Sequence, residues 1–281
     1  MEKKKDVAKT AFTAHLFAVN LLEKLVEVFR GLLTSNLLEF CIKWASRIGH
    51  FALIVAAGLG FLFALIFAIR SNSFQGFLFG LAWILIVFVV QYTAHKFSTA
   101  GETLIKNNPS QMSSKIFLDC FAFLVMIGGA VVFILQIVAA IRFGSFYPFF
   151  WGLGAFIFLE FVALIAFNPK EATIEIVKDN SAGQEAIGII TFLIKAIMRL
   201  VPIIFGIGVA IGTVLLFIDF IGLFGSNFGF AWIRGNATAV NILYAALLPF
   251  LSYLYFVLAY LVLDLIRAIL SIPGKLDKMA K

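Results

Sequence analysis

The chain has 281 residues, of which 62% are hydrophobic and 13% charged, and its mean hydropathy of +1.05 is far above what a soluble domain of this length needs for its core. This composition excludes a soluble globular protein and indicates a polytopic membrane protein. The net charge of +7 fits membrane topology and attraction to anionic lipid headgroups, and we expect no nucleic-acid partner.

The N-terminal segment, residues 1–49, is amphipathic. Apolar residues recur at three- and four-residue steps from Phe12 to Leu32, and charged residues fill positions between them. We predict a helical segment that lies in the headgroup plane on the cytoplasmic side, because basic amphipathic helices bind there by default. Docking on another protein is the alternative.

Six stretches of membrane-spanning length follow. Five contain no Asp, Glu, Lys or Arg, and the fourth in order is interrupted only by Glu160. A helix of about 20 residues crosses the hydrocarbon core, and continuous apolar runs exclude the alternation of a barrel strand. The predicted fold class is therefore an all-α integral membrane protein, with transmembrane helices at 50–69, 76–95, 117–141, 147–168, 200–220 and 242–263.

The basic residues predict the orientation. With six crossings, 19 of the 22 Lys and Arg residues fall on one side, in segments 1–49, 96–116, 169–199 and 264–281. Because cytoplasmic loops carry the excess of basic residues, we expect both termini in the cytoplasm. The high Phe content and the "KKK" start are typical of bacterial membrane proteins, so we expect the inner membrane.

An internal repeat relates the predicted helices. The stretch "AIRSNSFQGFLFGL" begins at Ala68 and "AIRFGSFYPFFWGL" at Ala140, an offset of 72 residues that also aligns "LIKNN" with "IVKDN". A third copy, "FGSNFGFAW", requires one insertion, "IRGNATAV", in the last external loop, and chance similarity competes with it. We predict three helical hairpins, 50–115, 116–182 and 183–281, the last with a basic tail.

Small residues mark the expected contacts between helices. Lipid supplies no hydrophobic drive for helices to associate, so helices pack where small residues allow a close approach. We expect packing within the chain rather than a dimer interface. The candidate packing positions are Gly60, Gly76, Gly80, Gly128, Gly129, Gly208 and Gly212.

Glu160 is the strongest candidate for a functional residue. A carboxylate inside a membrane helix costs several kcal/mol unless it is protonated or paired. The candidate partners are Gln136 on the third predicted helix and Lys195 or Arg199 near the fifth. Glu160 and Gln136 thus form a candidate intramembrane site. The alternative is that Glu160 is neutral or reaches water near the cytoplasmic interface.

Signatures of catalysis, cofactors and metals are absent from the sequence. There is no G-x-S-x-G motif, no P-loop, no dinucleotide fingerprint and no H-E-x-x-H motif. Cys41 and Cys120 are too few for a Cys-rich metal site, and His15, His50 and His95 are far apart in the sequence. We therefore expect a non-enzymatic protein with no cofactor and no metal.

Two functions fit these features. The first is a membrane scaffold or accessory subunit that packs against lipid and other membrane proteins, as the hairpins and the nearly charge-free interior favour. The alternative is a small-solute or proton-coupled transporter or channel that uses Glu160. Most transporters place several polar groups or broken helices at the midplane, whereas here Glu160, Gln136 and Pro249 are the candidates.

Overall fold

The computed structural model describes residues 17–32, 34–144, 147–177, 181–225 and 228–279. Helices dominate it, which confirms the predicted all-α class. The elements in chain order are α2 (Phe17–Leu32), α3 (Ser35–Ser71), α4 (Phe74–Asn107), β1 (Ser110–Met112), α5 (Lys115–Phe143), α6 (Tyr147–Phe167), η1 (Pro169–Ala172), β2 (Ile174–Ile176), α7 (Ala182–Gly222) and α8 (Phe228–Met279).

Among the described helices, five are long and apolar enough to cross a membrane. They are α3, α4, α5, α7 and the Phe228–Ile269 part of α8. Within α6, the stretch Trp151–Phe167 is a shorter apolar helix, so the sixth crossing is not identified among the described helices. The membrane class is supported by length and composition, and the count of six crossings stays a prediction.

The helices extend past the charge-free stretches. The predicted crossing at 50–69 is part of α3, which already begins at Ser35, and α7 likewise includes about five turns before the crossing at 200–220. The prediction of a loop at "IRGNATAV" is wrong, because α8 is helical from Phe228. Charged residues end the stretch that lipid can cover, but Arg and Lys are good helix formers and do not end a helix.

The chain divides into two compact units. Of the described residues, the smaller unit contains those up to Leu38 and those from Ser114 to Glu171, and the larger contains those from Glu39 to Ser113 and those from Ala172 onward. The predicted segments 1–49, 50–115, 116–182 and 183–281 therefore differ from the observed units. The larger unit joins the first and third predicted hairpins, and the smaller holds the second.

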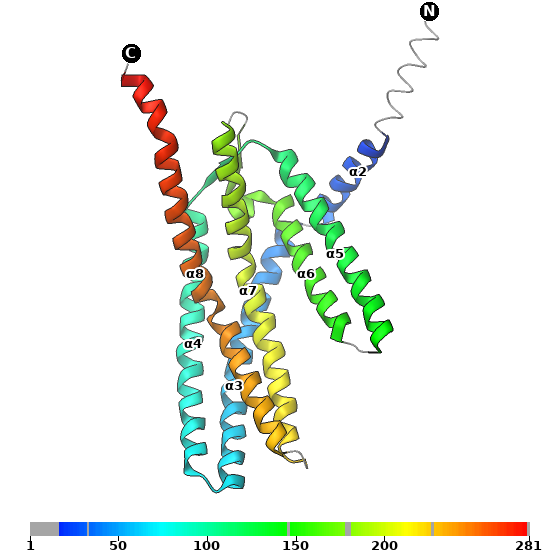
Figure 1. Ribbon diagram of the computed structural model, residues 1–281, viewed down its shortest axis with the longest axis vertical. Helices are drawn as coiled ribbons and strands as arrows, with labels where there is room; N and C mark the ends of the chain where they lie inside the picture. The colour runs from blue at the N-terminus through cyan, green and yellow to red at the C-terminus, as the bar shows by residue number, and fades with distance from the viewer. Residues whose placement is uncertain (1–16, 33, 145–146, 178–180, 226–227, 280–281) are drawn as a thin grey trace, which may run out of the picture. The chain divides into compact units, whose positions relative to one another are not determined.

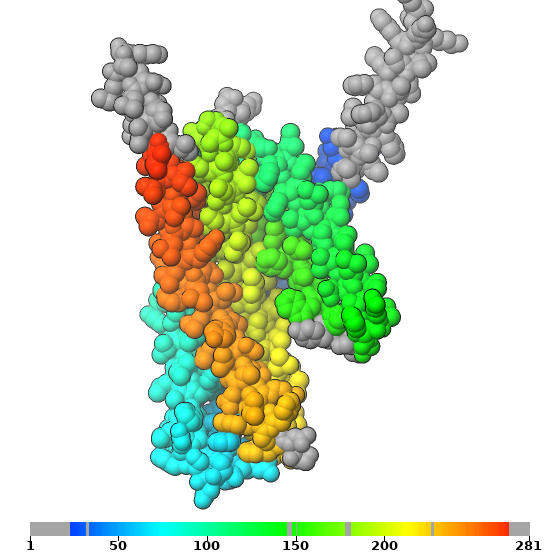
Figure 2. All heavy atoms as spheres, viewed as in Figure 1, coloured from blue at the N-terminus to red at the C-terminus, as the bar shows by residue number. Residues whose placement is uncertain are grey.

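The larger unit is a bundle of α3, α4, α7 and α8 (Figure 1). Figure 2 shows α8, in orange, lying flush against α7 and α4. The core comes from all four helices and includes Leu53, Val87, Phe205 and Ile242, each fully buried. Apolar residues elsewhere on these helices are exposed, as expected where lipid covers a surface.

Two short strands of the larger unit flank, in the sequence, the segment Ser114–Glu171 that belongs to the smaller unit. β1 and β2 pair in parallel, with Ser110 opposite Ile174 and Met112 opposite Ile176. The chain leaves the larger unit after β1 and returns through β2. The sequence analysis did not predict these strands, because three residues are too few for a periodic pattern.

The smaller unit contains α2 and the antiparallel pair α5 and α6. One stripe of α5, comprising Leu118, Ala122, Met126 and Gly129, is buried. The predicted amphipathic segment corresponds to α2 and the start of α3, and its first residues, 1–16, lie outside the described residues. Arg30 of α2 pairs with Asp119 of α5, which fixes α2 to this unit.

Candidate functional site

Glu160 and Gln136 both belong to the smaller unit and lie at different levels of the hairpin. Gln136 packs on α6, where its Cβ lies 2.5 Å from the position that a Cβ on Gly152 would occupy. Glu160 Oε1 lies 3.7 Å from the corresponding position at Gly129 of α5. Both side chains are partly buried, and within the described parts of the chain neither has a hydrogen-bond or ion-pair partner.

Lys195 does not serve as the partner of Glu160. Its side chain is fully buried in the larger unit, where Nζ donates to the carbonyl of Asn108 and to the hydroxyl and carbonyl of Thr173, the latter two at 3.1 and 3.3 Å. An ammonium has three donors, and three oxygen atoms accept them here. Lys195 thus joins the end of α4 to the chain segment just before β2.

The other basic candidate, Arg199, lies one turn further along α7. Its Nη1 is 4.0 Å from Glu102 Oε1 of α4, and Glu102 also accepts a 2.8 Å bond from Lys106. The Arg199 side chain is 12% exposed, so its guanidinium is largely withdrawn from solvent. Arg199 therefore contributes to a charged group within the larger unit.

Most of the predicted packing glycines face another helix closely. A Cβ on α4 at Gly76 or Gly80 would come within about 3 Å of α3, as expected for close helix packing. An added Cβ would come within 3.2 Å of a neighbouring helix at Gly60, Gly76, Gly80, Gly129, Gly208 and Gly212, whereas nothing lies within 4 Å at Gly128.

The closest approach of α3 and α7 was not predicted. A Cβ on Gly49 would lie 2.8 Å from the Cα of Gly206, and a Cβ on Gly206 would overlap the carbonyl oxygen of Ala45. These two glycines come from distant parts of the chain and have no i, i+4 glycine partner facing the same helix. Spacing within one helix therefore carries no signal for this contact.

A second buried ionic group, at the opposite end of the larger bundle, was also missed. Asp219 of α7 is 2% exposed and accepts bonds from Arg234 and, at 2.8 Å, from Thr238 Oγ1, both on α8. In the sequence Asp219 has the position of an ordinary helix-end residue, and both partners fall in "IRGNATAV", a segment expected in the last external loop. Once that segment is helical, Arg234 and Thr238 lie on one face, four residues apart.

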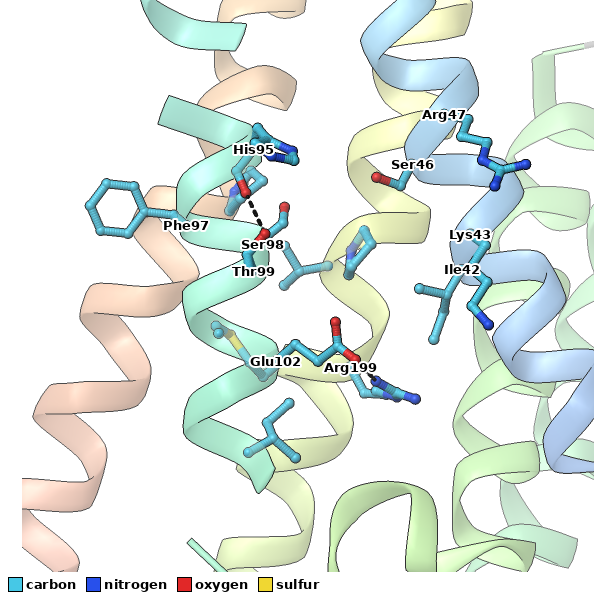
Figure 3. Close-up of a pocket in the computed structure, with 16 residues that line it drawn as sticks. Ile42, Lys43, Ser46, Arg47, His95, Phe97, Ser98, Thr99, Glu102 and Arg199 are labelled. Carbon is cyan, nitrogen blue, oxygen red and sulfur yellow. Dashed lines mark hydrogen bonds and ion pairs between the residues drawn. The ribbon is translucent and has the colours of Figure 1, made fainter. Parts of the chain in front are cut away.

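The larger unit contains a polar cavity of about 270 Å³ that sequence analysis did not predict (Figure 3). Ser46 points into it from α3 and Ser98 from α4, with Arg199 of α7 between the two helices. Lys43 and Arg47 extend along the outer side of α3, at the edge of the cavity. Three helices supply these residues, so no motif in one stretch of sequence could report them.

His95 lines this cavity, and His50 lies next to His95. The rings of His50 and His95 are 5.7 Å apart between centroids, and His50 also contacts Phe205 at 5.0 Å. Across the described residues, no group of three or more His, Cys, Asp or Glu side chains is placed to hold a metal ion. The rings of His50, His95 and Phe205 make an aromatic contact among α3, α4 and α7.

Comparison of the chain with protein-family models, curated proteins and solved structures finds no match. The chemistry of these sites is consequently argued from the residues of this chain alone.

Proposed function

We propose that the protein is a non-enzymatic scaffold or accessory subunit that packs against other membrane proteins and lipid. The observation that carries this proposal is the hairpin of α5 and α6, in which Glu160 and Gln136 have no polar partner among the described residues. A polar side chain in hydrocarbon is stabilised when another helix supplies a hydrogen bond. A helix of a second protein supplies that bond in this proposal.

The partner is a transmembrane helix that carries an amide, hydroxyl or basic side chain at the depth of Glu160. It lies against the hairpin on a face other than the buried stripe of α5. Gly128 of α5 and Gly154 of α6 leave open space within 4 Å of where a Cβ would be, which gives a second helix room to approach closely.

The proposal includes the finer topology. The chain crosses the bacterial inner membrane six times, as three related hairpins, and both termini are cytoplasmic. The support for this is the strong bias of Lys and Arg to the segments on one side, together with the 72-residue repeat.

The test is extraction of the full chain from its native membrane in mild detergent, followed by native mass spectrometry. The proposal predicts a hetero-complex of fixed stoichiometry, which Glu160→Leu disrupts while the chain still folds. The matched control is Glu175→Leu at an exposed position of β2, which removes the same carboxylate outside the apolar hairpin and leaves the complex intact.

A chain recovered alone near 31.0 kDa, or as a homo-oligomer, contradicts the accessory-subunit proposal. In that case proton-coupled uptake into vesicles tests the alternative, a transporter or channel. Uptake that the wild type supports and Glu160→Gln abolishes would establish transport as the function.

A further inference from the structure

The polar cavity of the larger unit lies at the depth where the membrane-spanning stretches end. Arg47 precedes the charge-free stretch of α3, Lys96 ends that of α4, and Arg199 precedes that of α7. Two of these residues line the cavity, and so does His95, the neighbour of Lys96. Because all three helices change from apolar to charged at this level, the cavity lies in the headgroup layer.

The charges around the cavity leave an excess of positive charge. Arg47 is exposed and, among the described residues, pairs with no carboxylate. Lys43 bonds Glu39 at 3.0 Å, and Lys106 bonds Glu102 at 2.8 Å, so both carboxylates already have a basic neighbour. When the ion-pair partners of the lining residues are included, the cavity has four basic side chains and two carboxylates. The basic residues are Lys43, Arg47, Lys106 and Arg199, and the acidic ones are Glu39 and Glu102.

The cavity also offers hydroxyl donors beside an apolar wall. Ser98 Oγ is buried and lacks a hydrogen-bond partner within the described structure, which normally costs free energy unless a bound group satisfies it. Ser46 points into the same space from the opposite helix (Figure 3). Met198, Val201 and Pro202 of α7 line the apolar part, where the glycerol region of a lipid fits.

We infer that this cavity binds a phosphate group, carried by the headgroup of an anionic phospholipid. Basic pockets between transmembrane helices on the cytoplasmic side recognise such headgroups, and guanidinium groups bind phosphate oxygens with charge-assisted hydrogen bonds. A volume of about 270 Å³ accommodates a headgroup and leaves the acyl chains in the bilayer. This inference does not depend on the proposed partner protein, since all its residues belong to the larger unit.

The test is a binding titration of the delipidated full chain in neutral detergent. Three probes are compared: short-chain phosphatidylglycerol, short-chain phosphatidylcholine and inorganic phosphate. We expect saturable binding of phosphatidylglycerol, stronger than that of phosphatidylcholine. Arg199→Gln and Ser98→Ala each weaken it about tenfold, the loss expected when one hydrogen bond to a charged group is removed.

The matched control is Lys96→Gln, which removes the same charge at the same depth but outside the cavity. The Lys96 Nζ lies 5.5 Å from the ring centroid of Tyr92 and does not line the cavity. Phosphatidylglycerol binding without inorganic phosphate binding identifies a lipid headgroup as the source, and equal binding of both identifies a soluble phosphate. No saturable binding of either, or an equal loss in the Lys96 variant, overturns the inference; size-exclusion chromatography verifies that each variant folds.

Discussion

Replacing Gly49 with alanine should push α3 and α7 apart at their closest approach. The new Cβ would lie 2.8 Å from the Cα of Gly206 and 3.1 Å from Cδ1 of Phe205. Carbon atoms in van der Waals contact are about 3.5–4.0 Å apart, so the two helices must separate by about 1 Å or tilt. Gly206 presents backbone to this contact, and backbone cannot rotate away as a side chain can.

The size of the effect follows from two opposing terms. Alanine is favoured over glycine in a helix by about 1 kcal/mol, whereas forcing an extra methyl group into a packed contact costs about 1–3 kcal/mol. Gly58→Ala on the same helix carries only the first term, since nothing lies within 4 Å of its Cβ position. The difference between the two variants therefore isolates the steric term, and Gly49→Ala should be less stable than Gly58→Ala by about 1–3 kcal/mol.

Reversible unfolding by SDS in mixed micelles, followed by circular dichroism, measures this difference. Gly206→Ala, on the opposite side of the contact, should show a loss at least as large, because its Cβ would overlap the backbone of Ala45. Equal stability of the Gly49 and Gly58 variants would refute the close packing of α3 on α7 and, with it, the arrangement of the four-helix bundle.

Two further predictions concern the buried lysine and the topology. Lys195→Met should lower the free energy of unfolding by about 1–3 kcal/mol, because it leaves the carbonyl of Asn108 without a donor, whereas the carbonyl of Thr173 keeps its bond from the Ser110 amide. An unchanged unfolding midpoint in the same micelle assay would show that Lys195 does not stabilise the fold. If six helices cross the membrane, the turn between α3 and α4 faces outward, so Ser73→Cys in a chain without its native cysteines should react with an impermeant maleimide in whole cells. Labelling only after the membrane is opened would reverse the orientation.

Sequence patterns located the apolar helices well but not their ends. The thickness of the bilayer sets the length of a charge-free stretch that crosses it. Five of the predicted crossings accordingly fall within long apolar helices. The ends of helices depend on caps and turns instead. The capping box of Ser181 and Gln184 begins α7 well before the membrane boundary at Arg199, and hydropathy does not report it.

The sequence likewise revealed some of the candidate sites and not others. Glu160 was identifiable because a lone carboxylate in an apolar stretch is a local anomaly. Lys195 was instead read as a possible partner of Glu160, and its actual acceptors are mainly backbone carbonyls, which every residue type provides. Asp219 and the polar cavity required knowledge of which helices are neighbours, and that information lies in tertiary packing rather than in periodicity.

The parallel pairing of β1 with β2 makes the hairpin of α5 and α6 the crossover connection between two strands of the larger unit. The chain leaves β1 after Met112 and enters β2 at Ile174, and because the strands are parallel it must travel back to the start of β2, which takes a connection of about a dozen residues or more. Both strands, Lys195 and its acceptors on Asn108 and Thr173 belong to the larger unit, and none of these contacts involves residues 114–171. A gene that gained or exchanged such a hairpin could change what the protein assembles with, while the bundle kept its fold.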